Sequence, residues 1–274
     1  MADQRKGGIA WTEETWNPTR GCSRVSTGCE RCYAERIAAR FSGDIDLGNG
    51  RTMADPDRKP NPFDGYARMT PGGPRWTGRV ELIPEKLDEP LRWKKPRRIF
   101  VTSMSDLFHE KLSDADRDRV FAVMALADWH TYQNLTKRPE NQLRYLSDPA
   151  TPYRVQKAMD AIAVALGKIY KPAALVWPLP GLWLGVSIED QETADERIPL
   201  LLETPAAVRW ISAEPLLGPI ELRFEWLPHG GLDSMYPRLD WVVCGGESGP
   251  SARPCDVSWV RSVIQQCRVA GVAC

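Results

Sequence analysis

Three cysteines lie close together near the amino terminus of the chain. Cys22, Cys29 and Cys32 are separated by six and then by two residues. Thiolates are the usual protein ligands of iron–sulfur clusters, and a cluster held by only three of them leaves one iron open to substrate or cofactor. A structural zinc site closes a tetrahedron with four ligands, and no fourth cysteine or histidine follows at zinc-finger spacing. The array therefore favours a cluster with open coordination.

Two other interpretations of this array stay open. His109, His130 and His229 are distant in the sequence, but folding could bring one of them to the thiols as the fourth ligand of a zinc ion. The three thiols could also bind nothing. Of the other cysteines, Cys255, Cys267 and Cys274 each stand alone and are expected to be single thiols, whereas Cys244 either faces the cluster or packs in the core.

The elements that must position the array alternate between strand and helix. Strands are predicted over residues 8–15, 98–104, 131–137, 182–188, 208–215 and 239–247. Helices are predicted over residues 29–41, 113–129 (with Ser113 as N-cap), 139–146, 151–166, 191–203 and 257–270. This alternation is typical of parallel strands joined by crossover helices. Six such units fit either an open doubly wound sheet or an incomplete barrel.

The chain of 274 residues is predicted to form one α/β domain. Residues 43–96 are rich in Gly, Pro and Asp without hydrophobic period, and we expect a long irregular insertion there. The last residues, 271–274, would begin a seventh strand, which suggests a truncated carboxyl end. No apolar run is long enough to span a bilayer and no signal core begins the chain, so we expect a cytoplasmic protein with no membrane partner.

The charges do not point to nucleic-acid binding by bulk attraction. The chain has 36 basic and 36 acidic residues, so its formal net charge is zero. Local patches remain candidates for phosphate contacts, including Arg20, Arg24, Arg31 and Arg36 near the cysteines. Trp76, Trp93 and Tyr66 could stack on bases. The basic run over residues 94–98 is expected to be a solvated face.

The cysteine array resembles the cluster loop of radical S-adenosylmethionine enzymes, which follows the first strand of a partial (β/α)6 TIM-like barrel. Through nearly the whole chain, TWNPTRGCSRVSTGCERCYAER, RRIFVTSMSDLFHE, LTKRPEN, WLGVSIEDQ, RWISAEPLLGPI and DWVVCGGESGPSARP resemble the phage gene product 37/68 family, whose function is unassigned. The array departs from the superfamily in its six-residue first gap and in Tyr33, which follows the last cysteine. The superfamily's Gly-Gly-Glu segment follows its second strand, whereas Gly245-Gly246-Glu247 ends the sixth.

The resemblance implies a [4Fe-4S] cluster on Cys22, Cys29 and Cys32, with S-adenosyl-L-methionine on the open iron. Reductive cleavage of that cofactor would yield a 5′-deoxyadenosyl radical that abstracts a hydrogen atom from the substrate. The electron would come from a donor such as flavodoxin or ferredoxin. The substrate is unknown, and nucleic acid or a nucleotide is suggested only by the family's occurrence in phages. The alternative is a non-catalytic, zinc-stabilised nucleic-acid-binding protein.

Polar residues follow every predicted strand, and in a barrel the strand ends meet at one mouth. A buried, unpartnered carboxylate costs several kcal/mol. The large number of charged residues at the strand ends therefore favours a ligand site over a core there. The residues assigned to cofactor binding are Asn17, Ser103, Ser105, Ser187, Glu189, Gly245, Gly246 and Glu247. Those assigned to catalysis are Asp106, Lys137, Arg138 and Glu214. Capping of the following helix is an alternative for Asp106, Glu189 and Asp190, and a solvated helix start for Lys137 and Arg138.

Overall fold

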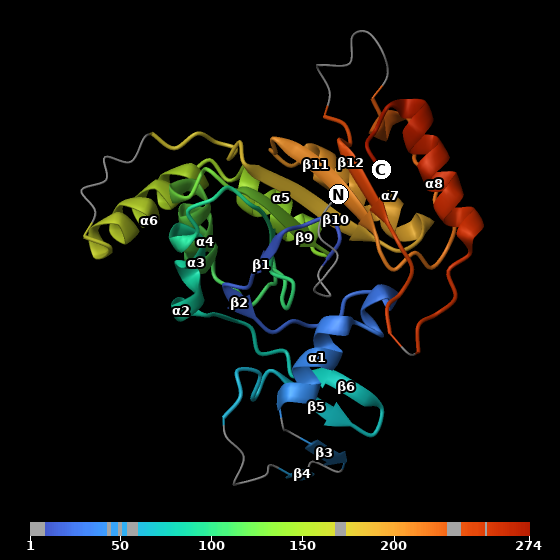
Figure 1. The fold of residues 1–274 in the computed structure, drawn as a ribbon, viewed down its shortest axis with the longest axis horizontal. Helices are drawn as coiled ribbons and strands as arrows, with labels where there is room; N and C mark the ends of the chain where they lie inside the picture. Colours follow the sequence, from blue (N-terminus) through green and yellow to red (C-terminus); the bar gives the residue numbers. More distant parts are fainter. Residues whose placement is uncertain are drawn as a thin grey trace.

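The computed structural model describes residues 9–42, 45–48, 51–53, 60–167, 174–228, 237–249 and 251–274. Within them, six strands form one parallel sheet (Figure 1). The strands are β1 (Glu14–Trp16), β8 (Arg98–Val101), β9 (Thr131–Thr136), β10 (Leu182–Ile188), β11 (Val208–Ala213) and β12 (Trp241–Cys244). Their order in the sheet, β1-β8-β9-β10-β11-β12, is their order in the chain, and every neighbouring pair is parallel. The predicted α/β class with parallel strands is confirmed.

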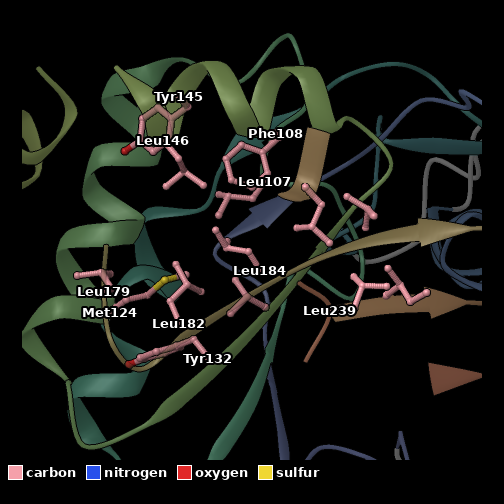
Figure 2. Close-up of a cluster of buried hydrophobic side chains, with 14 of the residues drawn as sticks. Leu107, Phe108, Met124, Tyr132, Tyr145, Leu146, Leu179, Leu182, Leu184 and Leu239 are labelled. Carbon is pink, nitrogen blue, oxygen red and sulfur yellow. The ribbon is translucent and has the colours of Figure 1, made fainter. Parts of the chain in front are cut away.

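The main helices cover one face of this sheet. They are α4 (Asp114–Leu126), α5 (Pro139–Ser147), α6 (Thr151–Ala165), α7 (Gln191–Glu203) and α8 (Val257–Ala270). Right-handed crossovers that always step in the same direction place every connection on the same side. The hydrophobic core accordingly lies between helices and strands, where Leu184 and Tyr132 pack with Met124 and Tyr145 (Figure 2). The other face of the sheet is left for a site.

Tryptophans fill part of that other face. In the sheet register, Gly185 of β10 lies beside Trp210 of β11, which lies beside Trp241 of β12. A Cβ atom on Gly185 would stand 2.5 Å from the Trp210 ring, so the indole needs a glycine beneath it. Trp11 packs edge-on against both tryptophans and against Phe100 of β8. This aromatic group links the two ends of the sheet, although β1 and β12 are not paired and no closed barrel is found among the described residues.

Several predicted boundaries hold, and others shift. The bounds predicted for α7 and α8 are confirmed, and Ser113 caps α4 by accepting the Asp116 N–H at 3.1 Å. The first strand is shorter than predicted, and Gly8 lies outside the described residues. The first helix, α1 (Tyr33–Ser42), begins after the cysteines because residues 27–29 form a 3-10 turn instead. After β11 the described residues contain only the short helix η2 (Phe224–Trp226) before β12.

The prediction of a long irregular insertion is wrong for the described residues. They form β3 (Ile45–Gly48), β4 (Arg51–Met53), β5 (Ala67–Thr70) and β6 (Gly73–Trp76), which make a small sheet, followed by α2 (Pro84–Leu87) and α3 (Glu89–Arg92). A further strand, β7 (Glu81–Leu82), pairs with β2 (Thr19–Arg20). The small sheet packs through Ala67 against Ala38 and Ala39 of α1. Strands of two to four residues are too short to show a period in the sequence.

At the carboxyl end, the chain returns to the parallel sheet. Ala273 forms an isolated parallel bridge with Trp241 of β12, and the Ala273 carbonyl accepts the Val242 N–H at 2.9 Å. The last residues therefore run where a seventh strand was expected. Among the described residues, the helices are all too short or too polar to cross a lipid bilayer.

Candidate functional site

The cysteine loop lies at the carboxyl ends of the parallel strands. It connects β2 to α1, and the Ser26 hydroxyl donates to the Glu189 carboxylate at 3.2 Å. Gly28 lies directly against that carboxylate, and a Cβ atom there would collide with it. A residue following β10 therefore holds the loop that carries the thiols.

All three thiols line one cavity of about 140 Å³. Its wall also includes predicted site residues from three strand ends, namely Ser103, Ser105, Asp106, Lys137, Arg138 and Ser187. Phe100 and Leu135 contribute apolar side chains from the sheet, and Tyr33 and Trp76 contribute aromatic ones. The structure thus brings together nine residues that the sequence spreads over more than 160 positions.

The thiols are half-buried, in surroundings that bear on metal binding. Burial raises the pKa of Cys22 to about 12, and the nearby Asp106 carboxylate adds to this while Arg138 opposes it. Burial also raises the pKa of Cys32, against the backbone N–H groups of Glu35 and Ala34, which donate to its sulfur at the start of α1. In the described part of the chain, no group of three or more His, Cys, Asp or Glu side chains is placed so that it could hold a metal ion. The donor chemistry fits a metal cluster, but the three sulfurs would have to draw together around it.

Arg138 lies beneath Cys22 and is almost wholly buried. Its guanidinium donates to Asp106 at 3.1 Å and to Glu110 at 2.8 Å, and one nitrogen lies 3.9 Å from the Cys22 sulfur. It also donates to the Ser23 hydroxyl at 2.8 Å. Asp106 in turn accepts from the Thr136 hydroxyl at 2.7 Å. The Arg138–Asp106 pair therefore orients Cys22, the first cysteine of the loop.

Lys137 and Glu189 form a second charged pair. The Lys137 ammonium lies 2.8 Å from Glu189 and donates to the Ser187 hydroxyl. Glu189 is fully buried and also pairs with Arg197 at 3.2 Å. Lys137 and Ser187 face the cavity, whereas Glu189 lies below the loop. Glu189 therefore positions the loop and does not itself line the thiol cavity.

Asn17 lies outside the thiol cavity. Its amide donates to the Ser103 hydroxyl at 3.0 Å and accepts the Met104 N–H at 3.0 Å, so it shapes the turn after β8. It lines a larger cavity of about 630 Å³ on the free side of β1. That cavity contains no thiol in its wall, so the smaller cavity remains the better candidate for chemistry.

The four predicted residues at the ends of β11 and β12 also lie outside the thiol cavity. Glu214 accepts from the Ser212 hydroxyl at 2.9 Å, and a Cβ atom on Gly245 would lie 2.6 Å from the Glu214 carboxylate. A Cβ atom on Gly246 would lie 3.1 Å from Cys255. The fourth, Glu247, forms an ion pair of 2.6 Å with Arg253. Protein atoms therefore occupy the space beside these residues.

The histidines that were candidates for a fourth zinc ligand are engaged elsewhere. His109 is close to the loop, but its Nε2 bonds the Ser23 hydroxyl at 2.9 Å and its Nδ1 accepts the Lys111 N–H at 3.1 Å. Burial, with the nearby Arg138 charge, lowers the pKa of His109 to about 4, so the ring is neutral. His130 bonds backbone groups of Arg97 and Pro90, and His229 lies outside the described residues.

Two features of the site had no signal in the sequence. Thr102, whose side chain lines the cavity, has φ +66°, a conformation that costs a β-branched residue about 1–3 kcal/mol and that concentrates at functional sites. The second is Arg197, the buried partner of Glu189. Its only trace in the sequence is a charged residue among the buried, mostly apolar positions of α7.

Cys255, Cys267 and Cys274 are free thiols, as expected. Nothing in the sequence indicated that Cys274 lies near Cys244 and Cys267, where burial and this neighbouring thiol raise the pKa of both to about 12.

Fold and site together define an α/β protein with one parallel sheet and a three-thiol cavity at its carboxyl edge. The family model described as "Protein of unknown function (DUF5131)" matches residues 6–274 of the chain, which therefore belongs to that family. No curated protein matches the chain, and no solved structure matches it.

Proposed function

We propose that this protein is an iron–sulfur enzyme of the radical S-adenosylmethionine type. In this proposal Cys22, Cys29 and Cys32 hold a [4Fe-4S] cluster, and S-adenosylmethionine occupies the iron without a protein ligand. One observation carries the proposal: three thiols of one loop line the same cavity as polar residues from successive strand ends. An isolated structural thiol would need neither the neighbouring thiols nor the cavity.

The strand order supports the barrel form of the fold that this proposal requires. In a doubly wound sheet the order reverses at a switch point, and helices cover both faces. Here the order is sequential and the helices lie on one face, as in a (β/α) barrel. We propose a partial (β/α)6 barrel, with the thiol cavity at its mouth. A cytoplasmic location fits all seven cysteines being free thiols.

The chain's own groups have definable tasks in this proposal. The cluster and its cofactor would supply reductive cleavage to a carbon radical, with the electron coming from a flavodoxin-like or ferredoxin-like donor. Arg138, 3.9 Å from the Cys22 sulfur, favours the thiolate that a metal requires. The N–H groups at the start of α1 do the same for Cys32. Phe100 and Leu135 keep the cavity floor apolar, which limits water near a reactive intermediate.

The test is anaerobic purification followed by measurement of metal content. We expect a brown protein with about four irons per chain that cleaves S-adenosylmethionine to 5′-deoxyadenosine when reduced. Cys29→Ala should lose the chromophore and the cleavage but keep the far-ultraviolet circular dichroism of the folded chain. Cys274→Ala, outside the loop, is the matched control and should keep both. One tightly held zinc with no cleavage, or an unfolded Cys29→Ala variant, would overturn the proposal in favour of a structural site.

A further inference from the structure

A second cavity adjoins the cysteine loop and is lined by arginines. Its volume is about 460 Å³, and its wall carries Arg24, Arg31, Arg36 and Arg75. Cys32 belongs to the walls of both this cavity and the thiol cavity. Strand β6 also separates the two, because Pro74 and Arg75 line the arginine cavity and Trp76 lines the thiol cavity.

The arginine cavity has an excess of positive charge. Glu30 is the one carboxylate in its wall, and it lies 3.4 Å from Arg253. Arg31 lies 3.7 Å from Glu247, a long ion pair. Across the described ranges, neither Arg36 nor Arg75 has a carboxylate within ion-pair distance. Arg24 is neutralised by Glu35, so the excess charge comes from Arg36 and Arg75. Two such guanidinium groups in one cavity repel each other, and an anionic ligand relieves that repulsion.

The cavity is held in shape by a buried carboxylate and by a close backbone contact. Glu35, only 1% exposed, pairs with Arg24 and also accepts the Trp76 N–H at 2.8 Å. That single carboxylate therefore joins the cysteine loop, α1 and β6. Gly249 lies directly against the Arg36 guanidinium, where a Cβ atom would collide with it. The arginines are thus presented by three tethered segments, which favours a built site over a chance surface cluster.

We propose that this arginine cavity binds a phosphate group of a nucleotide substrate, either free or within a single strand. Arginine presents a planar fork that matches phosphate oxygens in a bidentate way. S-adenosylmethionine carries no phosphate, so the cofactor has no phosphate group to neutralise the positive charge of the arginine cavity. A nucleotide held there by its phosphate would extend past Cys32 toward the thiol cavity, where Trp76 offers an aromatic face for a base. That this ligand is the substrate rests on the proposed function.

The experiment measures fluorescence anisotropy of labelled, short single-stranded DNA and RNA at several salt concentrations. Arg36→Ala and Arg75→Ala should each weaken binding about tenfold, and each should reduce the magnitude of the log–log salt slope by about 0.7. Arg268→Ala is the matched control, since this exposed arginine lies at the end of α8 remote from the cavity, and its affinity should equal that of the wild type. Unchanged far-ultraviolet circular dichroism in each variant verifies that the fold is intact.

Competition with a nucleoside monophosphate and with inorganic phosphate identifies the source of the phosphate. Displacement by the monophosphate supports a free nucleotide, and displacement only by unlabelled oligonucleotide supports a strand. The inference is overturned if no oligonucleotide or nucleotide binds at about 50 mM salt. It is also overturned if Arg268→Ala weakens binding as much as Arg36→Ala or Arg75→Ala does, or if an acidic peptide competes as well as an oligonucleotide does. A protein that holds iron and cleaves S-adenosylmethionine but binds no nucleotide would refute this inference alone. Nucleotide binding through the arginines in a protein that holds no iron would refute the proposed function alone.

Discussion

At the scale of single residues, the charged side chains around the cysteine loop divide into two groups. Lys137 and Arg138 line the thiol cavity. Glu189 and Arg197 lie below it, where both are almost fully buried and support the loop through Ser26 and Gly28. Buried charges of this kind are tolerated only because each has its partner. The position of the loop therefore depends on the ion pair between Glu189 and Arg197.

Glu189→Gln should destabilise the protein by about 3 kcal/mol, because it leaves the buried Arg197 without a carboxylate. The measurement is urea denaturation of purified protein. Asp195→Asn is the matched control, since it removes a surface pair with Arg223 whose side chains are 35% and 50% exposed. Its effect should be far smaller, because exposed pairs contribute little. Equal losses in the two variants would show that Glu189 does not anchor the loop.

At the scale of elements, the helices outside the sheet are tied to one another by charged groups at their ends. Asp114, in the first turn of α4, accepts from Arg117 at 2.6 Å and from Arg144 of α5 at 2.8 Å. Bonds to Arg144 first, and then to Arg117, lower the pKa of Asp114 to about 2. A carboxylate at a helix start also interacts favourably with the helix dipole.

This carboxylate should make stability depend on pH in the acid range. Since its pKa is lower in the folded than in the unfolded chain, its contribution is present above about pH 4 and is lost as the pH falls toward 2. The shift alone corresponds to at most about 2.4 kcal/mol, and solvent screening of a side chain 33% exposed reduces this to about 1 kcal/mol. Asp114→Asn should therefore be less stable than the wild type by about that amount at pH 7, and the difference should shrink to a small part of it by pH 2. A difference that persists unchanged at pH 2 would assign it to packing.

At the scale of the whole molecule, the cysteine loop is closed between segments from both ends of the chain. Arg253 donates to the Thr27 carbonyl at 2.9 Å, and the Glu247 carboxylate holds it in place. Arg31 donates to the Ser251 carbonyl. On the other side, β5 and β6 of the small sheet lie against α1 (Figure 1). Strand β6 contributes Trp76 to the thiol cavity and Arg75 to the arginine cavity. The site is thus an assembly of distant segments over the sheet's carboxyl edge.

Arg253→Ala should loosen the cysteine loop without unfolding the sheet. The loop amides of Cys29 and Glu30 bond carbonyls within the loop at 3.0 and 3.2 Å, so their hydrogen exchange reports its opening. We expect exchange about tenfold faster at these amides and little change in α4. Arg268→Ala should leave the loop unchanged. Uniformly faster exchange throughout the chain would instead mean that Arg253 contributes to global stability.

The sequence by itself determined the strands of the parallel sheet, its main helices and the edge at which the cysteine loop lies. Hydrophobic period and capping predicted α7, α8 and the start of α4, because these signals depend on residues only a few positions apart. The placement of the cysteines between the first strand and the first helix predicted a loop at the carboxyl ends of parallel strands. The short strands of residues 45–76 escaped prediction because they are too short to show a period, and β5 and β6 are instead held by packing on α1.

Only the tertiary structure decided which polar residues share a cavity. Lys137 and Glu189 are both strand-end residues in the sequence, yet one faces the thiols and the other lies beneath the loop. Arg36 and Arg75 are far apart in the chain and meet only because β6 packs beside α1. The physical reason is that a charge takes its role from partners brought close by long-range packing, and residues near it in the chain do not specify those partners.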